Sequence, residues 1–350
     1  MISYLDQDFS ALNDFLAKKQ PSKLFFLVDE NTHNDCLPIL LANLSTEIPF
    51  EIIEIEAGEE LKNIATATQL WEILAENEAN RKALLINLGG GVITDLGGFV
   101  ASTYKRGIAF VNVPTSLLGM CDASIGGKTG IDLNFLKNLV GTFSTPEKIF
   151  LYPDFLETLP FTELRSGFAE MLKHGLIRDA KHWEELIAIP ELTVTTIKPH
   201  IERSMQLKQE VVTLDFKEQN VRKTLNFGHT FGHAVESLFL KNQTIITHGE
   251  AVALGMICET HLSYLQKLIS SDVQEIIINN IQKYFPYISI AQFGDDEIIS
   301  LMKNDKKNDQ NTINFSLIES IGKGNFDQKV SENQLLEVLQ FYRNLGGNIH

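Results

Sequence analysis

A run of apolar residues that ends in three glycines constrains the fold of this chain most. The segment ALLINLGGGVITD, residues 83–95, reads as a buried strand, a glycine turn and the start of a helix. Glycine lets the backbone approach a phosphate closely, and a helix N-terminus offers free N–H groups. The segment therefore predicts either a pyrophosphate site or a tight turn without a ligand. It lacks the G-x-G-x-x-G pattern, so it does not by itself identify an ordinary dinucleotide fold.

The spacing of strand-like and helical segments predicts an α/β domain in the first part of the chain. We expect strands at 23–28, 52–55, 83–88, 109–113 and 148–151. Ligands of open α/β sheets bind at the carboxyl ends of the strands. Three of the expected strands end in turn or polar residues, so we expect a cofactor beside Asp29–Asn31, Gly89–Gly91 and Pro114–Ser116.

The rest of the chain has the pattern of a helical domain, with apolar residues at intervals of three and four. We expect helices at 162–178, 181–189, 196–213, 228–240, 248–268, 271–284 and 331–344, and a short hairpin between 312–317 and 328–330. A chain of 350 residues usually exceeds one hydrophobic core. The fold class is therefore predicted to be an α/β N-terminal nucleotide-binding domain with a Rossmann-like parallel sheet (1–157), plus an all-α C-terminal metal- and substrate-binding domain (158–350).

The formal charge of −15 argues against a nucleic-acid partner, because binding to a phosphate backbone needs a basic face. An acidic chain that binds an anionic substrate has to gather its Lys and Arg residues locally. The three Cys residues are scattered and form no CxxC pair, which favours a reducing cytoplasm. We expect neither a signal peptide nor a membrane span, since Lys105 and Arg106 interrupt the most apolar stretch.

A second motif, DASIGGKTG at residues 122–130, holds Lys128 between pairs of small residues and is followed by Lys137 and Asn138. An ammonium beside accessible backbone N–H groups suits an oxyanion. The alternative is a flexible surface turn without a ligand. The second Lys so close in the sequence favours anion binding.

A third motif carries histidines. His229 and His233 lie four residues apart and share one face of a predicted helix, and His248 begins the next helix. Zinc accepts imidazole and carboxylate ligands, and catalytic zinc sites use three protein ligands. With Glu170 as the carboxylate, three of these four residues suffice, and the spacing does not select which. His174 is expected to be a partly exposed helix residue without a role, and the charged run at 303–307 a solvated surface.

Eight motifs in a fixed order resemble the 3-dehydroquinate synthase family, from Asp29 to Lys307. They are GGGVITDLGGF, YKRG, PTSLLGMCDASIGGKTG, LKNLVGTF, SGFAEMLKHG, LNFGHTFGHAVE, HGEAVALGM and NDKKN. The resemblance implies a dehydroquinate synthase-like fold with NAD and a divalent metal, Zn²⁺ or Co²⁺, as cofactors. It implies that NAD is bound by Asp29, Asn31, Glu59, Lys62, Gly90, Gly91, Val92, Asp95, Thr115, Ser116, Asp122, Lys128 and Lys137.

The resemblance also assigns the metal to Glu170, His229 and His248, which leaves His233 for the substrate. The residues that it places around the substrate are Arg106, Asp122, Lys128, Asn138, Lys173, Lys208, Glu218, Arg222, Asn226, His233 and Lys306. Arg106 is implied to reach the substrate of a neighbouring subunit, and hence a homodimer. The cations among these residues would supply the local positive charge that the acidic chain needs.

The reaction that the resemblance implies is the conversion of 3-deoxy-D-arabino-heptulosonate 7-phosphate to 3-dehydroquinate and phosphate in the shikimate pathway. It combines a transient NAD-dependent oxidation, phosphate elimination, reduction, ring opening and aldol closure. A related sugar-phosphate cyclase, such as aminodehydroquinate or 2-deoxy-scyllo-inosose synthase, is the nearest alternative. A metal-dependent polyol dehydrogenase is disfavoured because a neutral polyol needs no cluster of cations, and a nucleotide-sensing module without chemistry because the metal set is intact.

Overall fold

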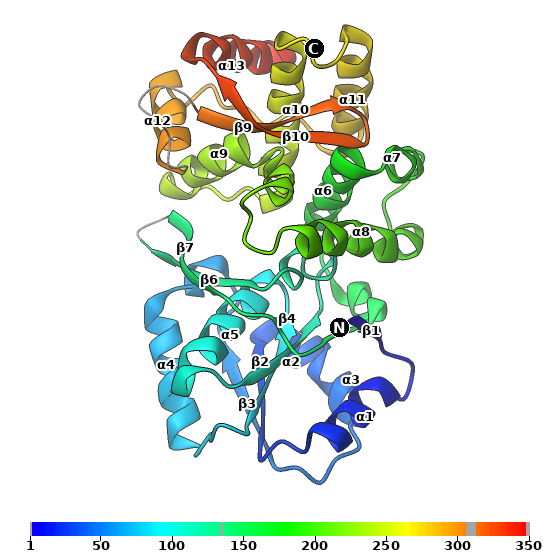
Figure 1. Cartoon of the computed structure of the whole chain (residues 1–350), viewed down its shortest axis with the longest axis vertical. Coiled ribbons are helices and arrows are strands. Elements are labelled where there is room, and N and C mark those ends of the chain that lie inside the picture. The colour runs from blue at the N-terminus through cyan, green and yellow to red at the C-terminus, as the bar shows by residue number, and fades with distance from the viewer. Residues whose placement is uncertain (1, 134–135, 306–312, 348–350) are drawn as a thin grey trace. The chain divides into compact units, whose positions relative to one another are not determined.

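The computed structural model describes residues 2–133, 136–305 and 313–347 (Figure 1). The chain divides into two compact units between Leu164 and Arg165, a few residues beyond the predicted boundary. In the described part of the chain, no helix is long and apolar enough to cross a membrane.

The N-terminal unit is built on a six-stranded parallel sheet. Its strand order is β1 (Ile2–Tyr4), β8 (Ile149–Leu151), β5 (Ala109–Pro114), β4 (Leu84–Gly89), β2 (Leu24–Asp29) and β3 (Phe50–Ile55). The five predicted strands are confirmed, and β1 was not predicted. Every residue of β4 is buried, as expected for a parallel strand that is covered on both faces.

Helices cover both faces of this sheet. Figure 1 shows α4 (Ile64–Glu76) and α5 (Gly91–Thr103) on one side, and α1 (Ser10–Lys19) and α3 (Leu37–Ala42) on the other. Alternate residues of the central strands pack against α4 and α5 in one apolar core, which includes Phe25, Leu27, Leu85, Leu70, Leu96 and Phe99. The short α2 (Glu30–Asp35) follows β2 directly.

An antiparallel hairpin of β6 (Lys128–Leu133) and β7 (Leu136–Phe143) follows a π-helical turn at Gly119–Ala123. The sequence predicted an anion-binding turn here and no strands. Its glycines allow close pairing of the two strands, since a Cβ on Gly141 would lie 2.2 Å from the Thr129 carbonyl oxygen. Lys128 is exposed at the start of the hairpin and belongs to a regular strand.

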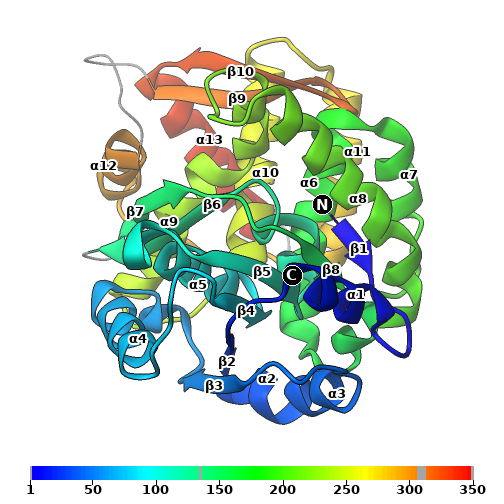
Figure 2. The ribbon, with the colours of Figure 1, turned by 60° about the horizontal axis from the view of Figure 1, so that its bottom comes forward.

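The C-terminal unit is helical apart from one hairpin (Figure 2). Its helices are α6 (Phe161–Arg178), α7 (Ala180–Ile187), α8 (Val194–Leu214), α9 (His229–Lys241), α10 (His248–Leu265), α11 (Ser271–Tyr284), α12 (Asp295–Asp305) and α13 (Glu332–Gly347). The seven predicted helices are confirmed, and α12 was not predicted. The predicted hairpin is present and longer than expected, as β9 (Ile313–Ser320) and β10 (Lys323–Val330).

Helix α10 is the centre of the C-terminal unit. Fourteen of its residues are buried, and it packs against α9, α11, α13 and β9. A helix that is buried all round needs apolar residues on every face, which explains why its sequence shows little amphipathic pattern. The helices α9 and α10 both begin with a histidine, and these two histidines start the candidate metal centre.

Candidate active site

The glycine turn lies where a sheet of this kind binds its ligand. Strand β4 ends at Gly89, and α5 begins at Gly91 with Gly90 as an N-cap that has no side-chain hydrogen bond. A Cβ on Gly90 would lie 3.2 Å from Ser116 Oγ, and one on Gly91 would lie 3.3 Å from Ala123 Cβ. Side chains here would crowd the turn, whereas glycines leave the N–H groups of the first helical turn open to an anion.

The other two predicted strand ends lie beside this turn. Strand β4 pairs with β5 on one side and with β2 on the other. Thr115 donates its N–H to the Gly89 carbonyl oxygen at 3.1 Å, so the residues after β5 adjoin the glycine turn. Asp29 ends β2 and caps α2, where its carboxylate accepts the Thr32 N–H at 2.8 Å. Three neighbouring strands therefore end in the residues expected to bind a nucleotide.

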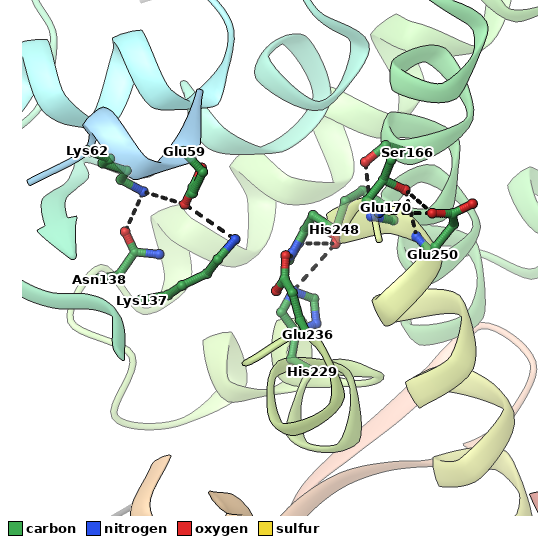
Figure 3. A network of polar contacts seen from close by, with 12 residues as sticks. Glu59, Lys62, Lys137, Asn138, Ser166, Glu170, His229, Glu236, His248 and Glu250 are labelled. Carbon is green, nitrogen blue, oxygen red and sulfur yellow. Dashed lines mark hydrogen bonds and ion pairs between the residues drawn. The ribbon is translucent and has the colours of Figure 1, made fainter. Parts of the chain in front are cut away.

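A network around Lys62 joins residues of three distant segments. Figure 3 shows its members Glu59, Lys62, Lys137 and Asn138. The buried Lys62 ammonium lies 2.7 Å from Asp95 Oδ2 on α5 and donates to Asn138 Oδ1 on β7 at 2.6 Å. Glu59 Oε1 lies 3.9 Å from Lys62 Nζ and 3.4 Å from Lys137 Nζ. Burial disfavours the Lys62 cation, but Asp95 and Glu59 outweigh burial and raise its pKa, so Lys62 stays charged.

The candidate metal centre lies in the C-terminal unit. Glu170 on α6 is completely buried, and its Oε1 lies 3.4 Å from His229 Nε2 and 3.6 Å from His248 Nε2. One ligand atom from each of these residues lies within 4.8 Å of the other two. Figure 3 shows both histidine rings directed at the Glu170 carboxylate. Two imidazoles and one carboxylate form a donor set that suits catalytic zinc.

The second ring nitrogen of each histidine faces a protein oxygen. His229 Nδ1 lies 3.1 Å from the Phe227 carbonyl oxygen, and His248 Nδ1 lies 3.5 Å from Glu236 Oε2. Metal-binding histidines are usually held in this way, because the outer contact fixes the tautomer and directs the other nitrogen at the metal. The residues present therefore fit a divalent metal bound through both Nε2 atoms.

Burial and nearby charges act differently on the two imidazoles. Burial, with Lys173 next, lowers the pKa of His229 and keeps that ring neutral. Burial also opposes the cation on His248, but the carboxylates of Glu236 and Glu170 raise its pKa to about 9. A metal ion at this centre would thus displace a proton from His248 on binding.

The start of α10 is anchored to α6, which places His248. Gly249 donates its N–H to Ser166 Oγ at 2.9 Å, and Arg165 forms an ion pair with Glu250. A Cβ on Gly249 would lie 2.3 Å from Ser166 Cα. The HGE motif therefore combines a candidate ligand, a close contact between two helices and a cap.

His233 belongs to the same cluster of rings. Its centroid lies 5.1 Å from that of His229 and 6.0 Å from that of His248. A second possible ligand set, His233, Glu236 and His248, also has its ligand atoms within 4.8 Å of one another. Geometry thus brings all three histidines together, as their spacing predicted, and offers two sets that share His248.

Several predicted substrate residues of this unit are buried. Lys173 forms an ion pair with Glu170, and Lys208 on α8 is 6% exposed. The prediction that His174 is partly exposed is wrong. It is 1% exposed because α8 covers that face of α6, and its Nδ1 lies 3.0 Å from Ser204 Oγ.

The segment between α8 and α9 is held by Asp215, whose carboxylate accepts the N–H groups of Gln219, Asn220 and Arg222. Arg222 is 2% exposed and donates from Nη1 to a backbone oxygen at 2.6 Å. Asn226 donates from Nδ2 to Glu218 Oε1 at 2.7 Å. The predicted residues Glu218, Arg222 and Asn226 therefore lie on one ordered segment.

Other predicted residues occupy separate positions. Asp122 lies in the π-helical turn, and Val92 lies in the first turn of α5. Arg106 is exposed, and both Lys105 and Arg106 have a positive φ, at 49° and 67°. Lys306 lies outside the described residues.

Two carboxylates near the candidate metal centre were not predicted from the sequence. Glu236 follows His229 by seven residues, so helical spacing would have placed it on the histidine face. Glu259 on α10 accepts the N–H groups of Gly228, Thr230 and Phe231 at the start of α9. No local signal marks Glu259, because its partners lie about thirty residues away in the sequence.

Comparison with known proteins gives matches over most of the chain. Residues 52–166 match the family model described as 3-dehydroquinate synthase N-terminal, and residues 167–308 match 3-dehydroquinate synthase C-terminal. The 3-dehydroquinate synthase of Parabacteroides distasonis is 41% identical over 339 residues, which are 95% of this chain and 95% of that protein.

Solved structures of similar fold include two other cyclases. The 2-epi-5-epi-valiolone synthase of Streptomyces hygroscopicus subsp. jinggangensis, solved with NAD⁺ and Zn²⁺, is 25% identical with a TM-score of 0.85, covering 99% of this chain and 97% of that one. A 2-deoxy-scyllo-inosose synthase complexed with carbaglucose-6-phosphate, NAD⁺ and Co²⁺ is 23% identical with a TM-score of 0.81. The match covers 97% of this chain and 96% of that one. The second likeness concerns the fold alone.

Proposed function

This chain belongs to the 3-dehydroquinate synthase family, and we propose that it converts 3-deoxy-D-arabino-heptulosonate 7-phosphate to 3-dehydroquinate and phosphate. The enzyme is a carbon–oxygen lyase that depends on NAD and a divalent metal. The observation that carries the proposal is the cluster of Glu170, His229 and His248 in a chain that matches the family over both of its units.

We propose that Glu170, His229 and His248 bind the metal, Zn²⁺ or Co²⁺. The bound ion would supply Lewis-acid chemistry, which lowers the pKa of a coordinated hydroxyl. This set is preferred over His233, Glu236 and His248 because the Nδ1 atoms of His229 and His248 face protein oxygens while both Nε2 atoms face Glu170. Glu236 then orients His248, and His233 remains available to the substrate.

NAD would be bound by the residues after β2, β4 and β5 and by the Lys62 network, and it would supply a transient oxidation of the substrate. Gly90 and Gly91 would expose backbone N–H groups to the pyrophosphate, since neither carries a side chain at the start of α5. Asp95 and Glu59 are held in place by Lys62, so they can accept hydrogen bonds from ligand hydroxyls without rearrangement. The same pre-organisation lowers the entropic cost of binding.

The substrate carries a phosphate and a carboxylate, and we propose that cations of this chain bind both. Arg222 presents a planar set of N–H donors that suits a carboxylate. Asn226 and Lys208 are assigned to the same carboxylate. Lys128, Asn138, Lys306 and Arg106 are assigned to the phosphate. Asn138 Oδ1 already accepts from Lys62, which leaves the Asn138 amide N–H₂ as the donor to the phosphate.

His233 is proposed to carry the proton of the hydroxyl that is oxidised. Its ring lies beside both metal-ligand rings, and imidazole is the side chain that most often transfers protons in general acid–base catalysis. The buried Lys173, which forms an ion pair with Glu170, would stabilise negative charge that develops on the substrate.

We further propose a cytoplasmic homodimer in which Arg106 reaches the substrate of the partner subunit. Support comes from the exposed position of Arg106 and from two successive non-glycine residues with positive φ. Such strained backbone persists where the surrounding structure holds a side chain in a functional position.

An assay of substrate choice tests the proposed function. Purified protein with NAD⁺ and Zn²⁺ is supplied with the heptulosonate phosphate, its amino analogue and the sugar phosphates of related cyclases. We expect phosphate release from the heptulosonate without net accumulation of NADH. No release from this compound would refute the proposal, and steady NADH formation would indicate a dehydrogenase.

A further inference from the structure

A second histidine cluster lies on α7 and α8, and none of its residues is assigned to catalysis. His182 and Glu185 lie three residues apart on α7, and His200 lies on α8. One ligand atom from each residue lies within 4.8 Å of the other two. His200 Nδ1 lies 3.8 Å from Glu185 Oε2, and the two imidazole centroids are 6.3 Å apart.

His182 is the residue that makes this cluster unusual. Its side chain is 1% exposed, and neither ring nitrogen has a hydrogen-bond partner among the described residues. An unsatisfied buried polar group costs about 1–3 kcal/mol, so a buried imidazole normally has a partner. Glu185 and His200 offer their ligand atoms on the side where His182 directs a ring nitrogen. The site has a buried end at His182 and a solvent-accessible end at Glu185.

The protonation state of His182 suits a metal ligand. Burial, with a smaller contribution from His174 and His200, lowers the pKa of His182 to about 4. The ring is therefore neutral at neutral pH, which is the form that binds metals. Lys181 Nζ lies 3.6 Å from Glu185 Oε1 on the exposed side, and a largely exposed lysine can leave a carboxylate at little cost.

We propose that His182, Glu185 and His200 form a second binding site for a divalent transition metal such as Zn²⁺. Two imidazoles and one carboxylate match the donor preference of zinc, with a fourth position open to water. The bound ion would link α7 to α8 and satisfy a ring nitrogen of His182. This inference is independent of the proposed function, because none of the three residues is assigned to substrate, NAD or the catalytic metal.

Metal content of untagged protein tests the proposal. His229→Ala removes one ligand of the proposed catalytic centre, so zinc that remains after unbound Zn²⁺ is dialysed away, and that is lost with His200→Gln, reports on the second site. We expect His229→Ala to retain one zinc ion per chain, and the double variant His229→Ala/His200→Gln to retain none. Affinity should fall at least about 100-fold, since even outer-shell changes at metal sites cost about 10–100-fold.

Matched variants distinguish the loss of a metal ligand from the loss of a surface charge. In the His229→Ala background, Glu185→Gln should also lose the ion, whereas the neighbouring exposed Glu184→Gln should keep it. Co²⁺ added to the same proteins should quench the fluorescence of Trp183, which adjoins His182 and is buried. In the wild-type background, His200→Gln should leave turnover unchanged.

Two results would overturn the proposal. One is His229→Ala protein that holds no zinc and shows no Co²⁺ quenching, which would mean that water satisfies His182. The other is zinc content that does not change in the His200→Gln and Glu185→Gln variants, which would place the ion elsewhere.

Discussion

The carboxylate of Glu259 accepts the backbone N–H of Gly228 at 2.6 Å, and it also accepts the N–H groups of Thr230 and Phe231 in the first turn of α9. The first turn of a helix leaves such donors without partners inside the helix. Here the cap comes from the middle of α10 and not from the preceding residue, because Gly228 has φ 82° and no side chain. A buried charge on one helix therefore fixes the position of His229, the first residue of the other.

Substitution of Glu259 by Gln should loosen this arrangement. The amide N–H₂ would face backbone N–H donors, so we expect a stability loss of about 1–3 kcal/mol. Zinc affinity should fall about tenfold, because His229 loses part of its support. Calorimetry and competition with a zinc chelator measure the two effects. Glu275→Gln, an exposed change on α11, is the matched control. A Glu259→Gln protein with wild-type melting temperature and zinc affinity would contradict this role.

Replacement by Gln should affect zinc binding differently at Glu170 and at Glu236. Glu170 is the proposed ligand, so Glu170→Gln should abolish zinc binding together with turnover. Glu236 contacts His248 Nδ1 at 3.5 Å, so Glu236→Gln should weaken zinc binding by about 10–100-fold. Excess zinc should then restore turnover in Glu236→Gln only. The reverse ranking of the two variants would favour His233, Glu236 and His248 as the ligand set.

Parts of the site formed by residues close together in the sequence could be predicted, whereas parts formed by residues far apart in the sequence could not. Helical spacing placed His229 and His233 together from the sequence alone, and the glycine turn was found because it lies within one strand–helix connection. The hairpin of β6 and β7 escaped prediction because its glycines and lysines resemble a binding loop. Glu259 could not be found, because a cap formed by a distant helix leaves no mark on the residues beside it.

Arg222 should act on the substrate and not on NAD. Charge-assisted hydrogen bonds contribute about 1.5–3 kcal/mol, so Arg222→Ala should raise KM for the sugar phosphate by about 10–100-fold. Arg222→Lys retains the charge but loses the planar set of N–H donors, and it should recover little of the affinity. Because Arg222 also donates to the Phe216 oxygen, melting temperature is measured alongside. Steady-state kinetics and NAD titration separate the effects, and equal loss of substrate and NAD affinity would show that Arg222 is placed wrongly.

Removal of the Lys62 cation should leave the carboxylates of Asp95 and Glu59 uncompensated. Breaking a buried ion pair costs about 3–5 kcal/mol, and we expect about 3 kcal/mol for Lys62→Met because Asp95 is partly exposed. The chain has two Trp residues, Trp71 in the N-terminal unit and Trp183 in the other. Urea unfolding in a Trp183→Phe background therefore reports on the N-terminal unit through Trp71.

A double-mutant cycle distinguishes lost pairing from lost packing at Lys62. Asp95→Asn removes the carboxylate that lies nearest to the Lys62 ammonium. If uncompensated charge causes the destabilisation, Lys62→Met/Asp95→Asn should unfold at a higher urea concentration than Lys62→Met alone. NAD affinity should fall in both variants, since Lys62 holds Asp95 and Asn138 in place. Additive losses of stability would indicate that the ammonium and the carboxylate do not interact, and that Lys62 contributes through its apolar stem.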